Sequence, residues 1–425
     1  MTIFVFVFSL LVLLAIGMPI AFALLVCGLI LMWWLGFNDP QSIMQNMWDG
    51  ANNFPLLAVP FFMAAGEFMN AGGMTRRIIR IAMTCVGHIR GGMGYVAIFA
   101  AIIMASLSGS AVADTAALAA ILLPMMRQAG YDAPRAGGLI AAGGIIAPVI
   151  PPSIPMILYG VQGQVSITKL FMAGIAPGIL MGVSLICVWR WYANKLNIPI
   201  QPRAPYSECF KAIGEGFWAL LLPLIVIGGL RLGYFTPTEA AIIAAAYSLF
   251  VGLVIYREIR IRDLYKLFLS SAKTTAVVMF LVTTATLSAW LITAANIPAQ
   301  LADLLKPVMH SQTLLIFTLM LLILAVGTMM DLTPTVLIMT PVLMPIIKQA
   351  HIDPVYFGVL FIINVSIGLI TPPVGTVLNV ICGTGKMSME KVVGGVWPFL
   401  LAEVVILFLL VIFPSLVIVP MRWFA

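Results

Sequence analysis

Apolar residues fill most of this chain in long stretches, which short polar, glycine- or proline-containing segments interrupt. A helix needs roughly 20 apolar residues to cross a bilayer. The first stretch holds Gly17-Met18-Pro19 near its centre, so it fits either one long span or two short ones. The pattern predicts spans near residues 2–33, 54–70, 136–160, 170–192, 213–231, 237–256, 270–293, 355–384 and 392–419.

Two further apolar blocks differ from these spans because their centres are polar and contain glycine or proline. They cover 93–129 and 313–349, about 37 residues each. This length suits two half-length helices that meet at a tip, which is a re-entrant hairpin. An amphipathic arm precedes each block, at 75–92 and at 297–310, and such arms suit the membrane interface.

Composition places the chain in the membrane. Of its 425 residues 62% are hydrophobic and 9% are charged, and the mean hydropathy is +1.12. A soluble domain has about 25% charged residues. The net charge of +7 suits basic cytoplasmic loops, and no basic patch with interleaved aromatics indicates nucleic-acid binding. The five cysteines are scattered without a CxxC, which predicts neither a disulfide framework nor a metal site. The N-terminus lacks a basic n-region and a cleavage site, so we interpret it as a retained span.

The positions of Lys and Arg predict the orientation of the spans. Basic residues cluster at 76–90, 190–211 and 257–273, and the positive-inside rule places all three clusters in the cytoplasm. The first hairpin then opens to the cytoplasm and the second to the opposite side. Nine crossings leave the C-terminus outside.

The two hairpin regions resemble each other at an offset of 221 positions. "LLPMMRQAGYD" at 122–132 matches "LMPIIKQAHID" at 343–353, and "IAPVIPPSIP" at 146–155 matches "IGLITPPVGT" at 367–376. The tips 106–114 and 327–335 align as well. A structural repeat of inverted topology, each unit with a hairpin and a broken helix, is typical of secondary transporters.

Prolines interrupt the helices at 144–153 and 364–376. We expect these breaks to supply the groups that bind solutes. Proline removes a backbone donor, and non-helical backbone is tolerated at membrane depth only where it lines a cavity or is buried in protein. The freed carbonyls can coordinate a cation, and the positive end of a half-helix can face an anion.

We therefore predict two pseudo-symmetric cation sites, one where each tip meets its break. Hard cations such as Na⁺ take oxygen ligands, which these segments supply. The first predicted site comprises Ser106, Ser108, Gly109, Ser110, Gly144, Ala147, Val149 and Pro151. The second comprises Gly327, Thr328, Asp331, Gly368, Thr371 and Pro372. The predicted substrate contacts are Ser110, Asp114, Ser153, Thr333 and Thr376.

Structural interpretations of the polar residues stay open beside these functional ones. Membrane serines also bond back to helix carbonyls. Asp114 and Asp331 also suit helix N-caps at the hairpin turns. Glu67 and Glu403 lie inside full spans, where we expect each to meet a basic or polar group at a subunit or domain boundary.

Taken together, "SLSGSAVADTAALAAILLPMM", "IAPVIPPSIPMI" and "GTMMDLTPTVLIMTPVLMPI" with "IGLITPPVGT" resemble the large membrane subunit of TRAP transporters (tripartite ATP-independent periplasmic, DctM type). The resemblance covers essentially the whole chain. It implies an elevator transporter of the bacterial inner membrane that imports organic anions, mostly carboxylates, with a Na⁺ gradient and no cofactor. It also implies two protein partners, a periplasmic substrate-binding protein and a small four-helix membrane subunit. No block of four spans precedes residue 1, so a separate small subunit or a trimmed fusion is expected. Overall likeness favours sialic acid over C4-dicarboxylates.

The expected fold is thus an all-α polytopic inverted-repeat transporter, with two re-entrant hairpins and two broken helices. Residues 1–92 hold N-terminal scaffold spans and an arm, 93–192 the first transport repeat, 193–312 more scaffold spans and the second arm, and 313–425 the second repeat. A stand-alone Na⁺/dicarboxylate symporter is the alternative within transport. A membrane subunit of a proton-pumping complex would place Lys, Glu or His at the breaks, which hold none. No metal-ligand spacing and no nucleophile–base pair indicates an enzyme.

Overall fold

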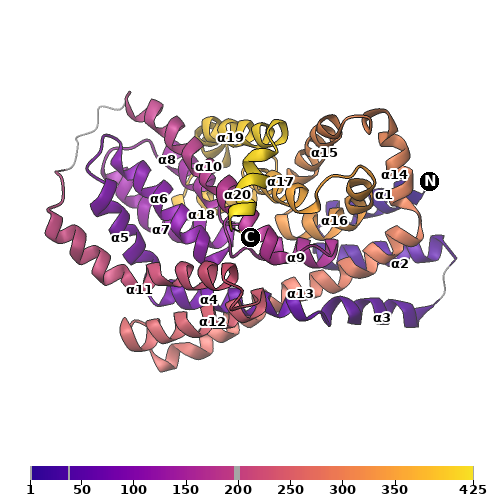
Figure 1. The fold of residues 1–425 in the computed structure, drawn as a ribbon, viewed down its shortest axis with the longest axis horizontal. Coiled ribbons are helices and arrows are strands. Elements are labelled where there is room, and N and C mark those ends of the chain that lie inside the picture. The colour runs from indigo at the N-terminus through magenta and orange to yellow at the C-terminus, as the bar shows by residue number, and fades with distance from the viewer. Residues whose placement is uncertain (1, 37–38, 196–201, 425) are drawn as a thin grey trace.

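The computed structural model describes residues 2–36, 39–195 and 202–424, which form helices and connecting loops without a strand (Figure 1). Within these ranges seven helices are long and apolar enough to cross a membrane. Six of them correspond to predicted spans, and the seventh, α16 (Leu332–Gln349), is the second helix of the second hairpin. The all-helical membrane fold expected from the sequence is confirmed.

The N-terminal apolar stretch forms two short helices, α1 (Thr2–Ala15) and α2 (Ile20–Trp34), which pack against each other. Gly17 between them has a φ of +85°, a conformation that glycine adopts readily. Pro19 follows at the N-cap position of α2. The alternative of one long span is therefore wrong.

A row of helices along the lower edge of Figure 1 forms one side of the molecule. Helix α13 (Leu264–Ala294) packs along α2, α3 (Pro40–Ala51) and α4 (Ala58–Ala71). Helix α4 also packs against α12 (Pro237–Phe250), and α12 against α11 (Tyr206–Arg231). Short helical turns η1 (Phe54–Leu57), η2 (Val251–Ile255) and η3 (Ile261–Asp263) extend α4, α12 and α13. Helix α3 was not predicted, because its sequence PQSIMQNMWDGA is too polar to be recognised as a span.

Both predicted amphipathic arms are helical. Helix α5 (Met74–Val86) buries Met74, Ile78 and Ile79 and packs against α6 (Gly92–Ser108) and α11. Helix α14 (Ile297–Leu305), followed by the turn η4 (Lys306–Val308), packs against α13 and α16.

The first predicted hairpin and broken helix are both present. The hairpin is α6 (Gly92–Ser108) and α7 (Ala111–Gln128), and the broken helix is α8 (Ala133–Gly144) and α9 (Ile154–Gly163). The long helix α10 (Ile167–Ala193) follows.

The second unit repeats this order. The hairpin is α15 (Gln312–Gly327) and α16 (Leu332–Gln349), and the broken helix is α17 (Pro354–Gly368) and α18 (Thr376–Gly385). The helices α19 (Met389–Ile412) and α20 (Ser415–Phe424) complete the described chain.

Two predicted boundaries need correction. Residues 364–368 remain helical, so the second break begins at Leu369 instead of Asn364. The Asn364 side chain is buried and donates to the Met320 carbonyl oxygen at 2.7 Å, which satisfies a polar group inside the helix pair. The predicted last span 392–419 is interrupted after Ile412, because Pro414 cannot continue the helical hydrogen bonds.

The two units interlock. The second hairpin arm of each unit packs against the second half of the other unit's broken helix: α7 against α18, and α16 against α9. Arg127 at the end of α7 donates to the Gly385 carbonyl oxygen at the end of α18. This packing between the two units brings the two hairpin tips and the two breaks to the centre of the molecule.

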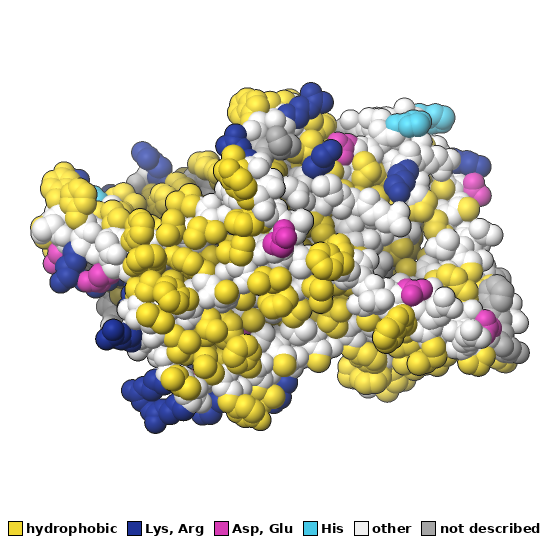
Figure 2. All heavy atoms as spheres, turned by 60° about the horizontal axis from the view of Figure 1, so that its bottom comes forward, with side chains coloured by type: hydrophobic (Ala, Val, Ile, Leu, Met, Phe, Trp, Pro, Cys, Tyr) yellow, Lys and Arg dark blue, Asp and Glu magenta, His cyan; other side chains and the backbone are white. Residues whose placement is uncertain are grey.

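The surface agrees with a membrane location. Figure 2 shows a broad hydrophobic face, with most Lys and Arg side chains toward its edges. Many large apolar side chains are exposed, among them Phe61, Phe217, Val277 and Leu401. In water this would be unfavourable, whereas lipid tails cover such a surface without cost.

Candidate functional site

The first hairpin tip is a compact hydrogen-bonded turn. Ser110 caps α7, since its hydroxyl accepts from the Ala113 N–H at 3.4 Å. The Ser108 hydroxyl accepts from the Ser110 N–H at 3.2 Å and donates to the Asp114 carboxylate. Asp114 is 1% exposed and lies within the first turn of α7, so its interpretation as an N-cap is wrong. Ser106 bonds back to the Ile103 carbonyl oxygen at 2.6 Å, as its structural interpretation expected.

This tip lies directly against the first break. Gly109 has a φ of +63°, and a Cβ added there would collide with the Pro152 carbonyl oxygen. Ser153 caps α9 by accepting from the Met156 N–H at 3.3 Å, and it donates to the Pro148 carbonyl oxygen. All residues from 148 to 153 are buried. The tip and the break therefore meet without a side chain between them.

The other predicted residues of the first site contact different parts of the fold instead of one common point. The Gly144 carbonyl oxygen accepts from the Ala147 N–H at 3.2 Å, and Gly144 packs against the Thr115 hydroxyl. The Val149 carbonyl oxygen lies against Gly174 of α10. The Pro151–Pro152 bond is cis, as is the Pro372–Pro373 bond of the second break. Sequence reasoning missed Thr115, whose buried hydroxyl has no hydrogen-bond partner within the described residues.

At the second tip, Asp331 combines two roles. Its carboxylate caps α16 by accepting from the Leu332 N–H at 2.9 Å, and it accepts from the Thr376 hydroxyl at 3.3 Å. Thr376 is the first residue of α18, so this bond joins the tip to the second break. Thr328 bonds back to the Ala325 carbonyl oxygen at 2.8 Å.

Close backbone packing also joins the second tip to its break. A Cβ added at Gly368 would collide with the Gly327 carbonyl oxygen. The Gly368 carbonyl oxygen accepts from the Thr371 N–H at 3.0 Å, and the Thr371 hydroxyl bonds back to Ile367 at 2.8 Å. Pro372 follows directly. Of the predicted residues of the second site, Gly327, Gly368 and Thr371 are thus in contact, whereas Thr328 bonds within α15 and Asp331 bonds to Leu332 and Thr376.

A cavity of about 100 Å³, here called the tip cavity, lies where the two tips meet. It joins Gly109 and Ser110 of the first tip to Asp331 and Thr333 of the second. Three helices begin at its wall: α7 after Ser110, α9 at Ile154 and α16 at Leu332. The predicted substrate contacts Ser110 and Thr333 share this cavity, whereas Asp114, Ser153 and Thr376 lie outside its lining. Its full lining is Met63, Gly109, Ser110, Ala111, Val112, Pro148, Ile154, Pro155, Val278, Asp331, Leu332, Thr333 and Leu369.

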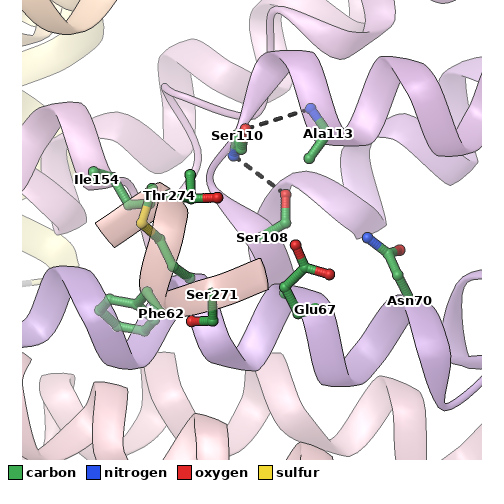
Figure 3. A pocket seen from close by; sticks show the side chains of 11 residues that line it. Phe62, Glu67, Asn70, Ser108, Ser110, Ala113, Ile154, Ser271 and Thr274 are labelled. Atoms are coloured by element: carbon green, nitrogen blue, oxygen red, sulfur yellow. Dashed lines mark hydrogen bonds between the residues drawn. The ribbon is translucent and has the colours of Figure 1, made fainter. Parts of the chain in front are cut away.

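A second cavity of about 90 Å³, here called the scaffold cavity, lies between the first tip and helices α4 and α13 (Figure 3). Ser110 lines both cavities, as do Met63 and Ile154. The remaining lining residues are Phe62, Gly66, Glu67, Asn70, Ser108, Ala113, Ser271 and Thr274. Figure 3 shows Glu67 rising from α4 toward Ser108 of the tip.

Glu67 and Glu403 both meet a polar group, as expected. Glu67 accepts from the Ser270 hydroxyl of α13 at 2.9 Å, and Glu403 accepts from the Ser184 hydroxyl of α10 at 3.2 Å. Sequence reasoning missed that Glu67 lines a cavity beside the tip. The spacing of Glu67 and Asn70, one turn apart in an apolar helix, was the available signal.

Neither cavity has a Lys, Arg or His in its lining. Within the described residues no three His, Cys, Asp or Glu side chains gather as a transition-metal site would require. The positive end of a helix dipole and its free N–H groups favour an anion. Three such helix ends surround the tip cavity, and the Asp331 carboxylate of the protein already lies at one of them, the start of α16. The starts of α7 and α9 remain as the ends at which the cavity favours a further carboxylate.

Comparison with known proteins identifies the family. The family model described as "Tripartite ATP-independent periplasmic transporter, DctM component" matches residues 7–416. A large permease protein of a 2,3-diketo-L-gulonate TRAP transporter from Escherichia coli is 56% identical over 423 residues, which cover 100% of both chains. The sialic acid TRAP large permease protein of Vibrio cholerae is 37% identical, with 96% of each chain covered. The C4-dicarboxylate TRAP large permease protein of Pseudomonas aeruginosa is 35% identical, with 91% of this chain and 90% of that protein covered.

A solved structure shares the fold. The YdaH transporter of Alcanivorax borkumensis, described as having an unusual topology, matches 87% of this chain and 86% of its own with a TM-score of 0.63. Its sequence identity is 15%, so this likeness concerns the fold alone. The family model and the relatives confirm the resemblance drawn from the repeated tip and break motifs. The chain belongs to the DctM family of tripartite ATP-independent periplasmic transporters, and it is a multi-pass membrane component of a transporter and not an enzyme.

Proposed function

We propose that this chain is the large membrane subunit of a Na⁺-coupled importer of an organic carboxylate in the bacterial inner membrane. The convergence of three helix N-termini on the tip cavity supports this proposal most directly. A carboxylate held there exchanges water for backbone N–H groups, and it leaves easily because no Lys or Arg holds it.

The Na⁺ ions bind at the two contacts between tip and break, at the sites predicted from the sequence. Hydroxyl, carboxylate and carbonyl oxygens gather there, as at Ser108 with Asp114 and at Asp331 with Thr376. Cations bound beside the cavity attract the carboxylate, which couples the two binding events.

Transport proceeds by an elevator movement, in which the interlocked hairpins and broken helices carry the site past α4 and α13. The scaffold cavity lies at this boundary, so the two parts touch there through polar groups and water-sized space instead of a continuous apolar core. A periplasmic binding protein delivers the substrate, and a small four-helix membrane subunit braces the scaffold.

The relatives order the candidate substrates. The 56% identity to a 2,3-diketo-L-gulonate permease makes a sugar acid the first candidate, ahead of the sialic acid expected from the sequence and of C4-dicarboxylates.

Uptake by proteoliposomes tests the proposal. The chain is reconstituted with its small subunit and binding protein, and uptake of labelled sugar acid, sialic acid and succinate is measured with and without an inward Na⁺ gradient. We expect uptake that requires all three proteins and Na⁺. Uptake without the binding protein would instead identify a stand-alone symporter, and uptake without Na⁺ would refute the coupling.

A further inference from the structure

The packing of the first amphipathic arm, α5, against α11 brings two of the five cysteines together. Cys85 lies in the last turn of α5, and Cys209 lies in the first turn of α11. Their sulfur atoms are 3.6 Å apart, although 124 positions separate the two residues in the chain. Cys85 is exposed and Cys209 is half-buried, so a small reagent can reach this pair.

The contact between the two cysteines belongs to a continuous interface between the two helices. Arg80 of α5 forms an ion pair with Glu215 of α11. A Cβ added at Gly216 of α11 would collide with the Ile81 side chain of α5, so the helices approach each other closely there. The two sulfur atoms therefore stay near each other while the arm remains on α11.

The cysteine pair lies at the end of the arm that leads into the first hairpin. Gly87, two residues after Cys85, is the C-cap of α5, and Gly91 is the N-cap of α6. The Gly91 carbonyl oxygen accepts from the Trp189 indole N–H of α10 at 2.8 Å. The short segment 87–91 therefore connects an arm held on α11 to a hairpin held on α10.

We propose that Cys85 and Cys209 form a peroxide-sensitive disulfide, which fixes the arm to α11 and slows transport. The effect on transport rests on the proposed function. In an elevator movement the first hairpin changes its position relative to α11, and the end of α5 must adjust to this change. A covalent bond at Cys85 removes that adjustment.

The chemistry needs only the two thiols and a peroxide. The Cys85 thiolate attacks one peroxide oxygen, the O–O bond breaks, and Cys85 becomes a sulfenic acid while hydroxide leaves. The Cys209 sulfur then attacks the Cys85 sulfur, the S–O bond breaks, and the departing oxygen leaves as water with the proton of the Cys209 thiol. Two thiols are thus oxidised to a disulfide, and hydrogen peroxide is reduced to water.

The surroundings of the pair favour a reversible reaction. Basic residues cluster in both segments, and the positive-inside rule places them in the cytoplasm, where thiols are kept reduced and disulfides are mostly transient. Partial desolvation and the neighbouring Cys209 thiol raise the pKa of Cys85. Its thiolate is therefore scarce at neutral pH, which keeps the pair reduced until peroxide accumulates.

Peptide mass spectrometry of the purified complex with the small subunit tests the disulfide. The complex is treated with hydrogen peroxide, free thiols are blocked with N-ethylmaleimide, and tryptic peptides are compared before and after reduction. We expect peptide 81–90, which contains Cys85, to be linked to peptide 204–211, which contains Cys209, and no other cysteine to be linked. Absence of this linked pair overturns the proposal.

Uptake by proteoliposomes tests the consequence for transport. Peroxide treatment should lower the initial rate of the wild-type protein by at least about threefold, and dithiothreitol should restore it. Cys85→Ser and Cys209→Ser should each keep their untreated rate. Cys187→Ser, at an exposed cysteine of α10, is the matched control and should respond like the wild type. Two single variants on different helices keep the test decisive if one of them fails to fold.

Three results separate the possible failures. A linked pair without a loss of uptake refutes the control of transport by the arm. An equal loss in Cys85→Ser assigns the loss to oxidation elsewhere and also overturns the proposal. Absence of uptake in the reduced wild-type protein refutes the proposed function, and with it the effect on transport, whereas the linked pair would still support the disulfide.

Discussion

The two hairpin tips each carry one carboxyl group, but the two groups lie one helical turn apart. At the aligned offset, Ser110 corresponds to Asp331, and Asp114 corresponds to Thr335. In the first tip serine is therefore the N-cap and the acid follows in the first helical turn. In the second tip the acid itself is the N-cap.

The different positions of the acid in the two tips give the two carboxylates different surroundings. Asp114 is enclosed by the first tip and accepts from Ser108, and one of its oxygens has no partner within the described residues. Asp331 is half-buried and lines the tip cavity. The breaks differ in the same direction, since 148–153 are buried whereas Pro373 and Val374 are exposed. Similar sequence thus produces one closed and one open contact between tip and break.

The largest effect is expected for Asp114→Asn. The carboxylate is buried beside the tip, and a neutral side chain of the same size removes its charge while keeping an acceptor for Ser108. We expect uptake to fall at least tenfold at saturating substrate, with a raised Na⁺ requirement. Asp132→Asn, at the exposed N-cap of α8, is the matched control and should stay near the wild-type rate. Uptake within twofold of wild type in Asp114→Asn would contradict a role of this charge.

Alanine substitutions at Gly109 and Gly368, the two close backbone contacts between tip and break, allow the two repeats to be compared directly. Gly109→Ala both strains a positive φ and collides with Pro152, so we expect a loss of about 2–4 kcal/mol in the free energy of unfolding. Gly368→Ala collides with Gly327 at an ordinary φ, and the expected loss is about 1–3 kcal/mol. Gly130→Ala has a φ of +85° in open space and isolates the backbone cost of about 1–2 kcal/mol. Unfolding of the purified variants measures the order, and equal losses in all three would exclude the packing explanation.

Asp331→Asn should have a moderate effect. Asparagine also caps helices, so α16 should persist while the charge beside the cavity is lost. We expect the Na⁺ concentration for half-maximal uptake to rise about three- to tenfold, with thermal stability unchanged. An unchanged Na⁺ dependence would remove Asp331 from the second cation site.

The smallest effect is expected for a substitution at the ion pairs of the amphipathic arms, α5 and α14. Ion pairs connect helix α5 to other elements, Arg76 and Arg77 to Glu258 and Arg80 to Glu215. The pair at α14 is local, because it joins Asp303 within the helix to Lys306 directly after it. Partly exposed pairs contribute about 0–1 kcal/mol each. Glu258→Gln should therefore lower the free energy of unfolding by less than about 2 kcal/mol and reduce uptake less than twofold. A complete loss of uptake would show that the arm position controls transport.

Local pattern was sufficient for much of the fold. Runs of apolar residues predicted six of the long helices, and glycine and proline between them predicted both tips and both breaks. For the first stretch, Gly17 and Pro19 left one span or two open, and the structure has two helices. These features depend on hydrogen bonds and burial within one segment, so they can be recognised without the neighbouring segments. The polar helix α3 was not predicted, because its stability comes from packing against α13.

The candidate site was predictable only in part. The repeat identified Ser110, Asp331 and Thr333 as neighbours of the breaks, and these residues do meet in the tip cavity. Nothing in the repeat indicated that Thr376 bonds to Asp331, or that the Val149 carbonyl oxygen lies against Gly174. Both contacts depend on the direction of a group in space, which a linear pattern does not specify.

Residue order alone settled the class of protein, the helical repeat and the kinds of polar group at its centre, because transfer into lipid constrains every residue separately. Tertiary packing decided which of these groups face one another. The packing of α7 against α18 and of α16 against α9 brings the tips together. The close approach of α4 at Gly66 places Glu67 beside Ser108. These residues are far apart in the chain, so only the packing of whole helices determines their distance.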